Sequence, residues 1–459
     1  MGTIQICGVI GVIAVVIMIS VLSGRKVKNS ADFESSSGKA GYGIVSGIIM
    51  GTIIGGASTI GTAQLAYSYG LSAWWYTLSC GAGCLMMGLL AAKPYRRAEE
   101  TTLIGILRHA FGVKAGVAAS LVYAVATLLG LIAQLMSASA VLPFIFPGIS
   151  GEVSVFLSAV LMLIYVTFGG ALGIGQIGKI KTILLYVAII SGSIIVLRST
   201  GIHDMWNTLD HDTYFNLFVF GHSKELSKAL SVMLGLFTSQ TYMQAFRSSC
   251  SDRVARGSEF ISAVLIPPIG FGSMLIGMFM QIHHPALENA KDALPQFVLN
   301  YMPDWLSGIV MGTLLLATIG SGASIVLGSS VSICRDILQP VCHRFDASKH
   351  SLLFMRLFIV LFLAAGGLFA TGLVGDFILN ITSMGAGLRA TGIIAPLVCA
   401  LLIPKKVDRK WALGAILVGP TIVAVFSFWQ VLPFDALFAG ILGSLVCCVI
   451  GIAFKTIKY

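Results

Sequence analysis

Apolar runs of about twenty residues, the length that crosses a lipid bilayer as a helix, recur along almost the whole chain. Reading the sequence in this way gives about thirteen candidate membrane spans, separated by short polar segments. Tilted or interrupted helices accommodate the longest of them. The approximate spans are 4–23, 42–69, 71–92, 112–142, 152–168, 179–197, 227–246, 258–282, 306–331, 353–371, 377–403, 411–430 and 435–454.

The composition points to the same class of protein. Of the 459 residues, 56% are apolar and only 10% are charged, and the mean hydropathy is +0.92. Soluble proteins carry about 25% charged residues, so most of this surface is expected to face lipid. The net charge of +10 is therefore better explained by cytoplasmic loops than by a nucleic-acid partner. We predict an all-α polytopic protein of the cell inner membrane, with lipid but no nucleic acid as a partner.

The positive charges predict an orientation. If the N-terminus is outside and the spans alternate, nearly all lysines and arginines fall inside, in stretches such as "KPYRR" and "KKVDRK". Such an asymmetry places the C-terminus in the cytoplasm. No basic segment precedes residues 3–23, so we expect a retained first span rather than a signal peptide. The exceptions are Arg198, Lys224, Lys228 and Lys291 outside, and Arg389 within a span.

Residues 169–190, "GGALGIGQIGKIKTILLYVAII", contain the spacing Gly173-x-Gly175-x-x-Gly178 of a dinucleotide-binding loop. That motif requires a preceding strand and an acidic residue about 20 positions later, and neither is present. We interpret the segment as a short cytoplasmic connection between the spans 152–168 and 179–197. Its glycines would let two helices turn and pack closely.

Two spans are rich in small polar residues. Residues 46–62, "SGIIMGTIIGGASTIGT", make a poor continuous helix, because each Gly costs about 1 kcal/mol relative to Ala. The segment is either a tight packing face or an interruption near the midplane whose free carbonyls hold a cation. In "ATIGSGASIVLGSS", residues 317–330, the small side chains Ala317, Gly320, Ser321 and Ser324 share one helical face.

In order and spacing, these segments resemble the sodium:solute symporters. The resemblance runs from "SADFESSSGKAG" through "GGAST", "YRRAEETTLIGILRHAFG" and "TSQTYMQAFRSSCSDRVARGS" to "ATIGSGAS" and "GAGLRATGIIAPL". It implies a leucine-transporter-like inverted five-plus-five helix repeat that works by alternating access. The implied parts are an extra helix and cytoplasmic link (1–41), a first repeat (42–197), an extracellular connection (198–226), a second repeat (227–403), and two extra helices with a cytoplasmic tail (404–459).

The resemblance also implies a sodium site. The positions that match the family's ligands are Ala57, Ile60, Ala317, Gly320 and Ser321. At Gly320 the family usually has Ser or Thr, so a hydroxyl ligand is missing. Family members commonly have Thr-Asp where this chain has Ile177-Gly178, and that acid lies on the cytoplasmic path of the ion.

Two lysines stand beside the missing acid. Lys179 and Lys181 are either ordinary cytoplasmic-end lysines that reach water or one of them, Lys181 in preference, enters the ion site. A buried lysine can gain and lose a proton, so it would then replace sodium with a proton. We expect sodium as the coupling ion, with proton coupling through a lysine as the alternative.

The expected solute is a small polar molecule, with a carboxylate as one possibility. Arg389 lies within a span, where a charge indicates a functional site, and its guanidinium suits a carboxylate; alternatively it caps broken-helix carbonyls. Ser58, Thr59 and Gln64 match solute-contacting positions in related transporters, and Gln134 either contacts the solute or bonds a neighbouring helix. No set of catalytic residues is visible, so an enzyme is not expected; the alternatives from other classes are a transport-like sensor or a membrane enzyme.

Overall fold

The computed structural model describes residues 1–24, 38–338, 349–373, 376–403, 406–429 and 435–457. Over these residues the chain is helical, without β-strands, as predicted. The predicted link at 25–37 lies outside the described residues. The elements are α1 (Thr3–Gly24), α3 (Tyr42–Ile53), η1 (Ala57–Gly61), α4 (Thr62–Tyr69), η2 (Gly70–Trp74), α5 (Trp75–Leu90), α6 (Ala92–Arg97), α7 (Leu103–Phe111), α8 (Val113–Ile145), α9 (Gly151–Ser199), α10 (Gly201–Thr208), α11 (His211–Tyr214), α12 (His222–Phe237), α13 (Gln240–Ser248), α14 (Asp252–His283), η3 (Ala290–Asp292), α15 (Ala293–Tyr301), α16 (Asp304–Ile333), η4 (Cys334–Leu338), α18 (Lys349–Gly372), α19 (Ile378–Leu402), α20 (Arg409–Trp429) and α21 (Ala436–Ile457).

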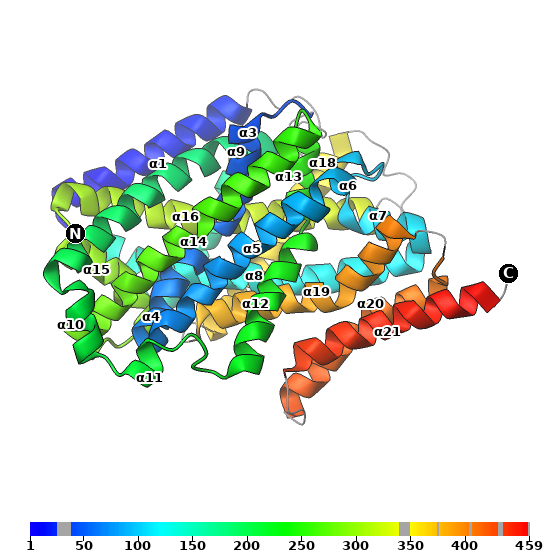
Figure 1. Cartoon of the computed structure of the whole chain (residues 1–459). Helices are drawn as coiled ribbons and strands as arrows, with labels where there is room; N and C mark the ends of the chain where they lie inside the picture. Colours follow the sequence, from blue (N-terminus) through cyan, green and yellow to red (C-terminus); the bar gives the residue numbers. More distant parts are fainter. Residues whose placement is uncertain (25–37, 339–348, 374–375, 404–405, 430–434, 458–459) are drawn as a thin grey trace.

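The helices form one bundle, and α1 begins and α21 ends at opposite ends of it (Figure 1). Nine helical segments of the described chain are long and apolar enough to cross a membrane, and three shorter apolar helices accompany them. The outer surface carries large apolar side chains, among them Phe156, Val264 and Leu368, which are 70%, 72% and 74% exposed. A surface of this kind is stable only against lipid.

The first core helix is interrupted, as one of the two sequence interpretations predicted. Helix α3 ends at Ile53, residues 54–56 are not helical, and the chain resumes as the π-helical turn η1 and then α4. Gly55 and Gly56 lie in the interruption. A Cβ at Gly55 would overlap the Ser321 hydroxyl, and one at Gly56 would overlap Ser137. Only glycine lets the chain pass this close to α8 and α16.

A second interruption separates α12 from α13. The sequence predicted one continuous span over 227–246, but helix α12 begins at His222 and ends at Phe237, and α13 starts at Gln240. The Arg389 guanidinium donates a hydrogen bond to the carbonyl of Gly235, in the last turn of α12 (3.3 Å). The freed backbone groups at this break are thus partly satisfied by a side chain from α19, as interrupted membrane helices require.

The predicted connection at 169–178 is wrong, because α9 runs without interruption from Gly151 to Ser199. The glycines in this segment form close helix contacts and do not make a turn between two helices. A Cβ at Gly178 would overlap the carbonyl oxygen of Gly47, and one at Gly47 would overlap the carbonyl oxygen of Gly175. The predicted close packing is therefore confirmed, between α9 and α3. Small residues that let two backbones approach are typical of helix contacts in membranes.

Candidate functional site

The ammonium of Lys181 lies at the point where α9, α3 and α16 meet. Its Nζ donates hydrogen bonds to the carbonyl of Gly51 (2.6 Å), the carbonyl of Ala317 (3.2 Å) and the hydroxyl of Ser321 (3.0 Å). The side chain is 1% exposed. An ammonium has three N–H donors and no acceptor, so these three oxygens satisfy it completely.

The Ser321 hydroxyl completes the arrangement. It accepts a hydrogen bond from Lys181 and lies 3.0 Å from the Gly51 carbonyl, to which it can donate. No described carboxylate forms an ion pair with Lys181 within 4.0 Å, so its positive charge is balanced by oxygen dipoles alone. Oxygen dipoles are what a sodium site offers as well. In this conformation the site does not fit a sodium ion, because the ammonium already holds its oxygens.

Two glycines that depart from the family pattern make room for this lysine. At position 320 a Cβ would lie 3.3 Å from the Tyr165 hydroxyl and 3.7 Å from Lys181 Nζ. A Ser or Thr there would require the Tyr165 hydroxyl to shift slightly and would lie in contact with the ammonium. The contact between Gly178 and the backbone of α3 leaves no space for an Asp at position 178. Both departures therefore follow from packing around α9.

The other predicted ion-site positions are placed differently. The carbonyl of Ala57 accepts a hydrogen bond from the Thr62 hydroxyl (3.1 Å), and the hydrogen bonds of Lys181 reach neither Ala57 nor Ile60. Instead the contribution of α3 comes from Gly51, which the sequence reasoning missed because a glycine carbonyl carries no side-chain signal. Lys179 is half-buried, and its side chain packs along Gly43 and Gly47, away from the ammonium site.

The predicted solute residues surround the first interruption, where their polar groups bind backbone. The hydroxyls of Ser58 and Thr59 donate to the Gly55 carbonyl (3.0 and 2.8 Å). Gln134 accepts from the amide of Gly56 (3.0 Å). Gln64 donates to the Asp376 carbonyl and accepts from the Ile378 amide, tying α4 to the start of α19. A solute role for these four residues stays a prediction.

Arg389 shows features of both of its sequence interpretations. Its guanidinium donates to Gly235 and lies 6.0 Å from the centroid of the Tyr123 ring. This is the geometry of a residue that caps a broken helix. However, its Nε is buried and has no hydrogen-bond partner. A donor left in that state is available to an anionic group, so the carboxylate hypothesis stays open.

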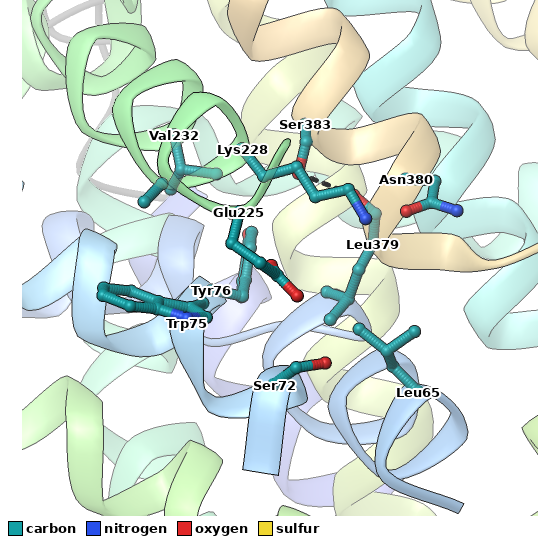
Figure 2. Close-up of a pocket in the computed structure, with 11 residues that line it drawn as sticks. Leu65, Ser72, Trp75, Tyr76, Glu225, Lys228, Val232, Leu379, Asn380 and Ser383 are labelled. Atoms are coloured by element: carbon teal, nitrogen blue, oxygen red, sulfur yellow. Dashed lines mark hydrogen bonds between the residues drawn. The ribbon is translucent and has the colours of Figure 1, made fainter. Parts of the chain in front are cut away.

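A pocket that the sequence reasoning missed lies between α4, η2, α5, α12 and α19. Figure 2 shows Glu225 and Lys228 of α12 reaching into it, opposite Ser72 of η2 and Asn380 of α19. The available signal was an acid and a base three residues apart at the start of a predicted span. The charge pattern alone assigns Lys228 to an outside segment and gives it no further role.

Glu259 of α14 is a second charged residue that the sequence reasoning missed. It is 0% exposed, and neither carboxyl oxygen has a hydrogen-bond partner. The Cys84 thiol is a close neighbour of this carboxyl. Its position inside the predicted span 258–282 was the signal, because an acid within a membrane helix is by default a functional candidate.

Comparisons with known proteins agree with this architecture. A sequence model of the sodium:solute symporter family matches residues 38–419. The high-affinity choline transporter 1 of Caenorhabditis elegans is 25% identical over 76% of this chain and 67% of its own length. The human high affinity choline transporter 1 is 23% identical over 84% of this chain and 71% of its own. A solved Na+-coupled sialic acid symporter superposes with a TM-score of 0.82 at 18% identity, covering 99% of this chain and 98% of that one.

Proposed function

Since the chain belongs to the sodium:solute symporter family, we propose that it is a secondary transporter in which the Lys181 ammonium replaces the coupling sodium ion. The observation that carries the proposal is the set of three hydrogen bonds from Lys181 Nζ to Gly51, Ala317 and Ser321. Two of these residues, Ala317 and Ser321, are positions at which the family resemblance implies sodium ligands. The coupling ion would then be a proton, carried on and off Lys181.

The chemistry of a buried amine supports this form of coupling. With its proton, Lys181 joins α3 to α16 through charge-assisted hydrogen bonds, each of which contributes about 1.5–3 kcal/mol. Without it, the amine is neutral, and these bonds weaken together. The protonation state of one side chain thus biases the contact between two core helices. Alternating access requires such a contact to form and break in each cycle.

The solute of the proposed transporter is a small polar molecule. The similar proteins include choline transporters and a sialic acid symporter. Choline and sialic acid differ in charge, so these names do not identify the solute of this chain. A thermal-shift screen of small metabolites on the purified protein would supply a solute for transport assays.

The test is uptake of that solute into proteoliposomes, driven in turn by a sodium gradient and by a proton gradient. We expect accumulation with the proton gradient in sodium-free buffer. Lys181→Met, which keeps the length of the side chain but not its charge, should abolish the proton-driven accumulation. Lys179→Met is the matched control, because that lysine lies two positions away and outside the site; it should retain uptake.

Two results would reject the lysine mechanism. One is sodium-driven accumulation that persists in Lys181→Met, which would return the coupling role to a sodium ion. The other is uptake by wild type that is indifferent to both gradients, because a secondary symporter accumulates solute only against an ion gradient. A folded Lys181→Met sample, verified by its melting temperature and gel-filtration profile, is required for either conclusion.

A further inference from the structure

The pocket at Glu225 contains polar groups that no protein atom satisfies. The Glu225 side chain is 2% exposed, and its Oε1 has no hydrogen-bond partner. Ser72, also 2% exposed, places its hydroxyl near the Glu225 carboxylate, and this hydroxyl too lacks an aligned hydrogen-bond partner. Leaving such groups unpaired costs about 1–3 kcal/mol each. Two of them facing one space indicate a ligand that supplies hydrogen-bond donors.

A positive charge enters the same pocket one helical turn away. Lys228 and Glu225 are three residues apart on α12, close enough for an ion pair on a helix surface, yet no such pair forms within 4.0 Å. Instead the Lys228 ammonium lies 4.2 Å from the centroid of the Phe220 ring. Figure 2 shows both charged groups directed into the space between α12, η2 and α19. The two groups therefore act on each other, and Asp435 acts on Lys228, only through the longer-range attraction of their charges and not through an ion pair.

The walls of the pocket limit what it can hold. Apart from the groups already described, it is lined by Leu65, Trp75, Tyr76, Ala229, Val232, Leu379, Asn380 and Ser383. The enclosed space is about 20 Å³, which accommodates a single water molecule. This conformation is thus closed, and a solute would enter when α12 or α19 moves away from α5. An apolar wall with few convergent polar groups is typical of small-molecule sites.

From this arrangement we propose that the transported solute is a small zwitterion, bound between α12 and α19. Its ammonium group would be held by Glu225 and Ser72, and its acidic group by Lys228, with a short apolar body against Leu65 and Val232. This inference rests on the proposed transport function. It does not depend on the coupling ion, because Lys181 lies in a separate site between α3, α9 and α16.

Binding to the purified full-length protein tests the proposal without any gradient. The probes are three matched sets: the zwitterions β-alanine, γ-aminobutyrate and proline; the carboxylates propionate and butyrate; and the cations propylamine and choline. Each is titrated at millimolar concentration while the melting temperature is recorded. We expect stabilisation by at least one zwitterion and by none of the compounds that carry a single charge.

Charge-neutralising variants locate the site. Glu225→Gln and Lys228→Met should each weaken zwitterion binding about tenfold or more, the effect of losing one charge-assisted hydrogen bond. Lys224→Gln is the matched control: it removes an exposed charge from the same helix and should bind as wild type does. If Glu225→Gln does not fold, Ser72→Ala replaces it, with a smaller expected loss.

Three outcomes would overturn the proposal. Carboxylates that bind as well as zwitterions, with no loss in Glu225→Gln, would move recognition to an anion site such as Arg389. Cations that bind as well as zwitterions, with no loss in Lys228→Met, would leave a cation site. Stabilisation by none of the zwitterions would remove this solute class altogether. If uptake depends on the gradients while the expected binding of zwitterions is not observed, only the solute proposal fails and the proposed transport function stands.

Discussion

At the scale of single residues, the protein is organised around one lysine and the glycines that admit it. Gly178 permits α9 to touch the backbone of α3, and Gly320 leaves space beside Tyr165 and the Lys181 ammonium. Position 178 has no space for the acid that the family resemblance implies, and a side chain at position 320 would require the Tyr165 hydroxyl to shift. The glycines at positions 178 and 320 and the buried Lys181 thus belong to the same packed region around α9.

The close contact at Gly178 leads to a direct prediction. Gly178→Ala should lower stability by about 1–3 kcal/mol, the usual cost of overpacking, because the new methyl group meets the Gly47 carbonyl rather than a side chain that can move. The measurement is the melting temperature of the purified variant. Gly414→Ala is the control, since a Cβ there has no neighbour within 4 Å. Equal melting temperatures for the two variants would contradict the packing account.

At the scale of helices, two of the core elements are interrupted. The break between α3 and η1 frees backbone that Gln134 and Ser58 then bind, and the break between α12 and α13 is capped by Arg389. The lysine site lies beside the first of these breaks, and the charged pocket lies at the other end of α12 from the second. The short elements η3 and α15 connect α14 to α16 and are not part of the long membrane helices. Asp292 lies at the junction of η3 and α15.

Asp292 predicts a pH dependence of stability. Burial raises its pKa to about 6, although Lys291 beside it acts in the opposite direction. An unfolded Asp has a pKa of about 3.9, so between these values the folded state binds more protons, and stability falls as pH rises. Asp292→Asn should therefore be more stable than wild type at pH 7, by about 1 kcal/mol in free energy of unfolding because the Asp292 side chain is partly exposed. Its melting temperature at pH 7 should be correspondingly higher.

The same comparison at low pH is the control for Asp292. Near pH 4 the wild-type carboxyl is protonated in the folded state, so the difference between the two melting temperatures should shrink toward zero. A constant difference across the pH range would mean that the carboxyl charge is not its cause.

At the scale of the whole molecule, Lys181 connects three of the core helices. Its hydrogen bonds join α9 to α3 and to α16. Helices α20 and α21, by contrast, pack mainly on each other and on α19, and they lie at the edge of the bundle in Figure 1. Loss of the lysine contacts should therefore loosen α3 and leave α20 and α21 unchanged.

Hydrogen exchange measured by mass spectrometry tests this division. In Lys181→Met the amides of Tyr42–Ile53 should exchange faster than in wild type, because α3 loses its tie to α9 and its local opening becomes easier. The peptides of Ala436–Ile457 should be unchanged and serve as the internal control. Uniformly faster exchange would indicate general destabilisation instead, and unchanged exchange in α3 would show that the ammonium does not hold this helix.

The sequence by itself determined the class of the protein. Apolar runs of membrane length, the scarcity of charge and the ordered family motifs are properties of the local chain, and they predicted the helical bundle and the family, with a break in the first core helix as one of two interpretations of residues 46–62. They also indicated that Gly320 and Ile177-Gly178 depart from the family pattern near the expected ion site, with Lys181 close by. Because hydropathy and motif order are read along the chain, they needed no tertiary information.

Only the tertiary structure decided which groups meet. The choice between a lysine that reaches water and one that enters the ion site depends on the path of α9. The sequence interpretation had broken that helix at the glycines which in fact pack it against α3. Gly51 contributes a backbone carbonyl, which has no signature in the sequence, and the Glu225–Lys228 pocket requires α12, η2 and α19 to converge. Such contacts join residues 130 or more positions apart, and their geometry comes from helix packing, which the order of residues alone does not specify.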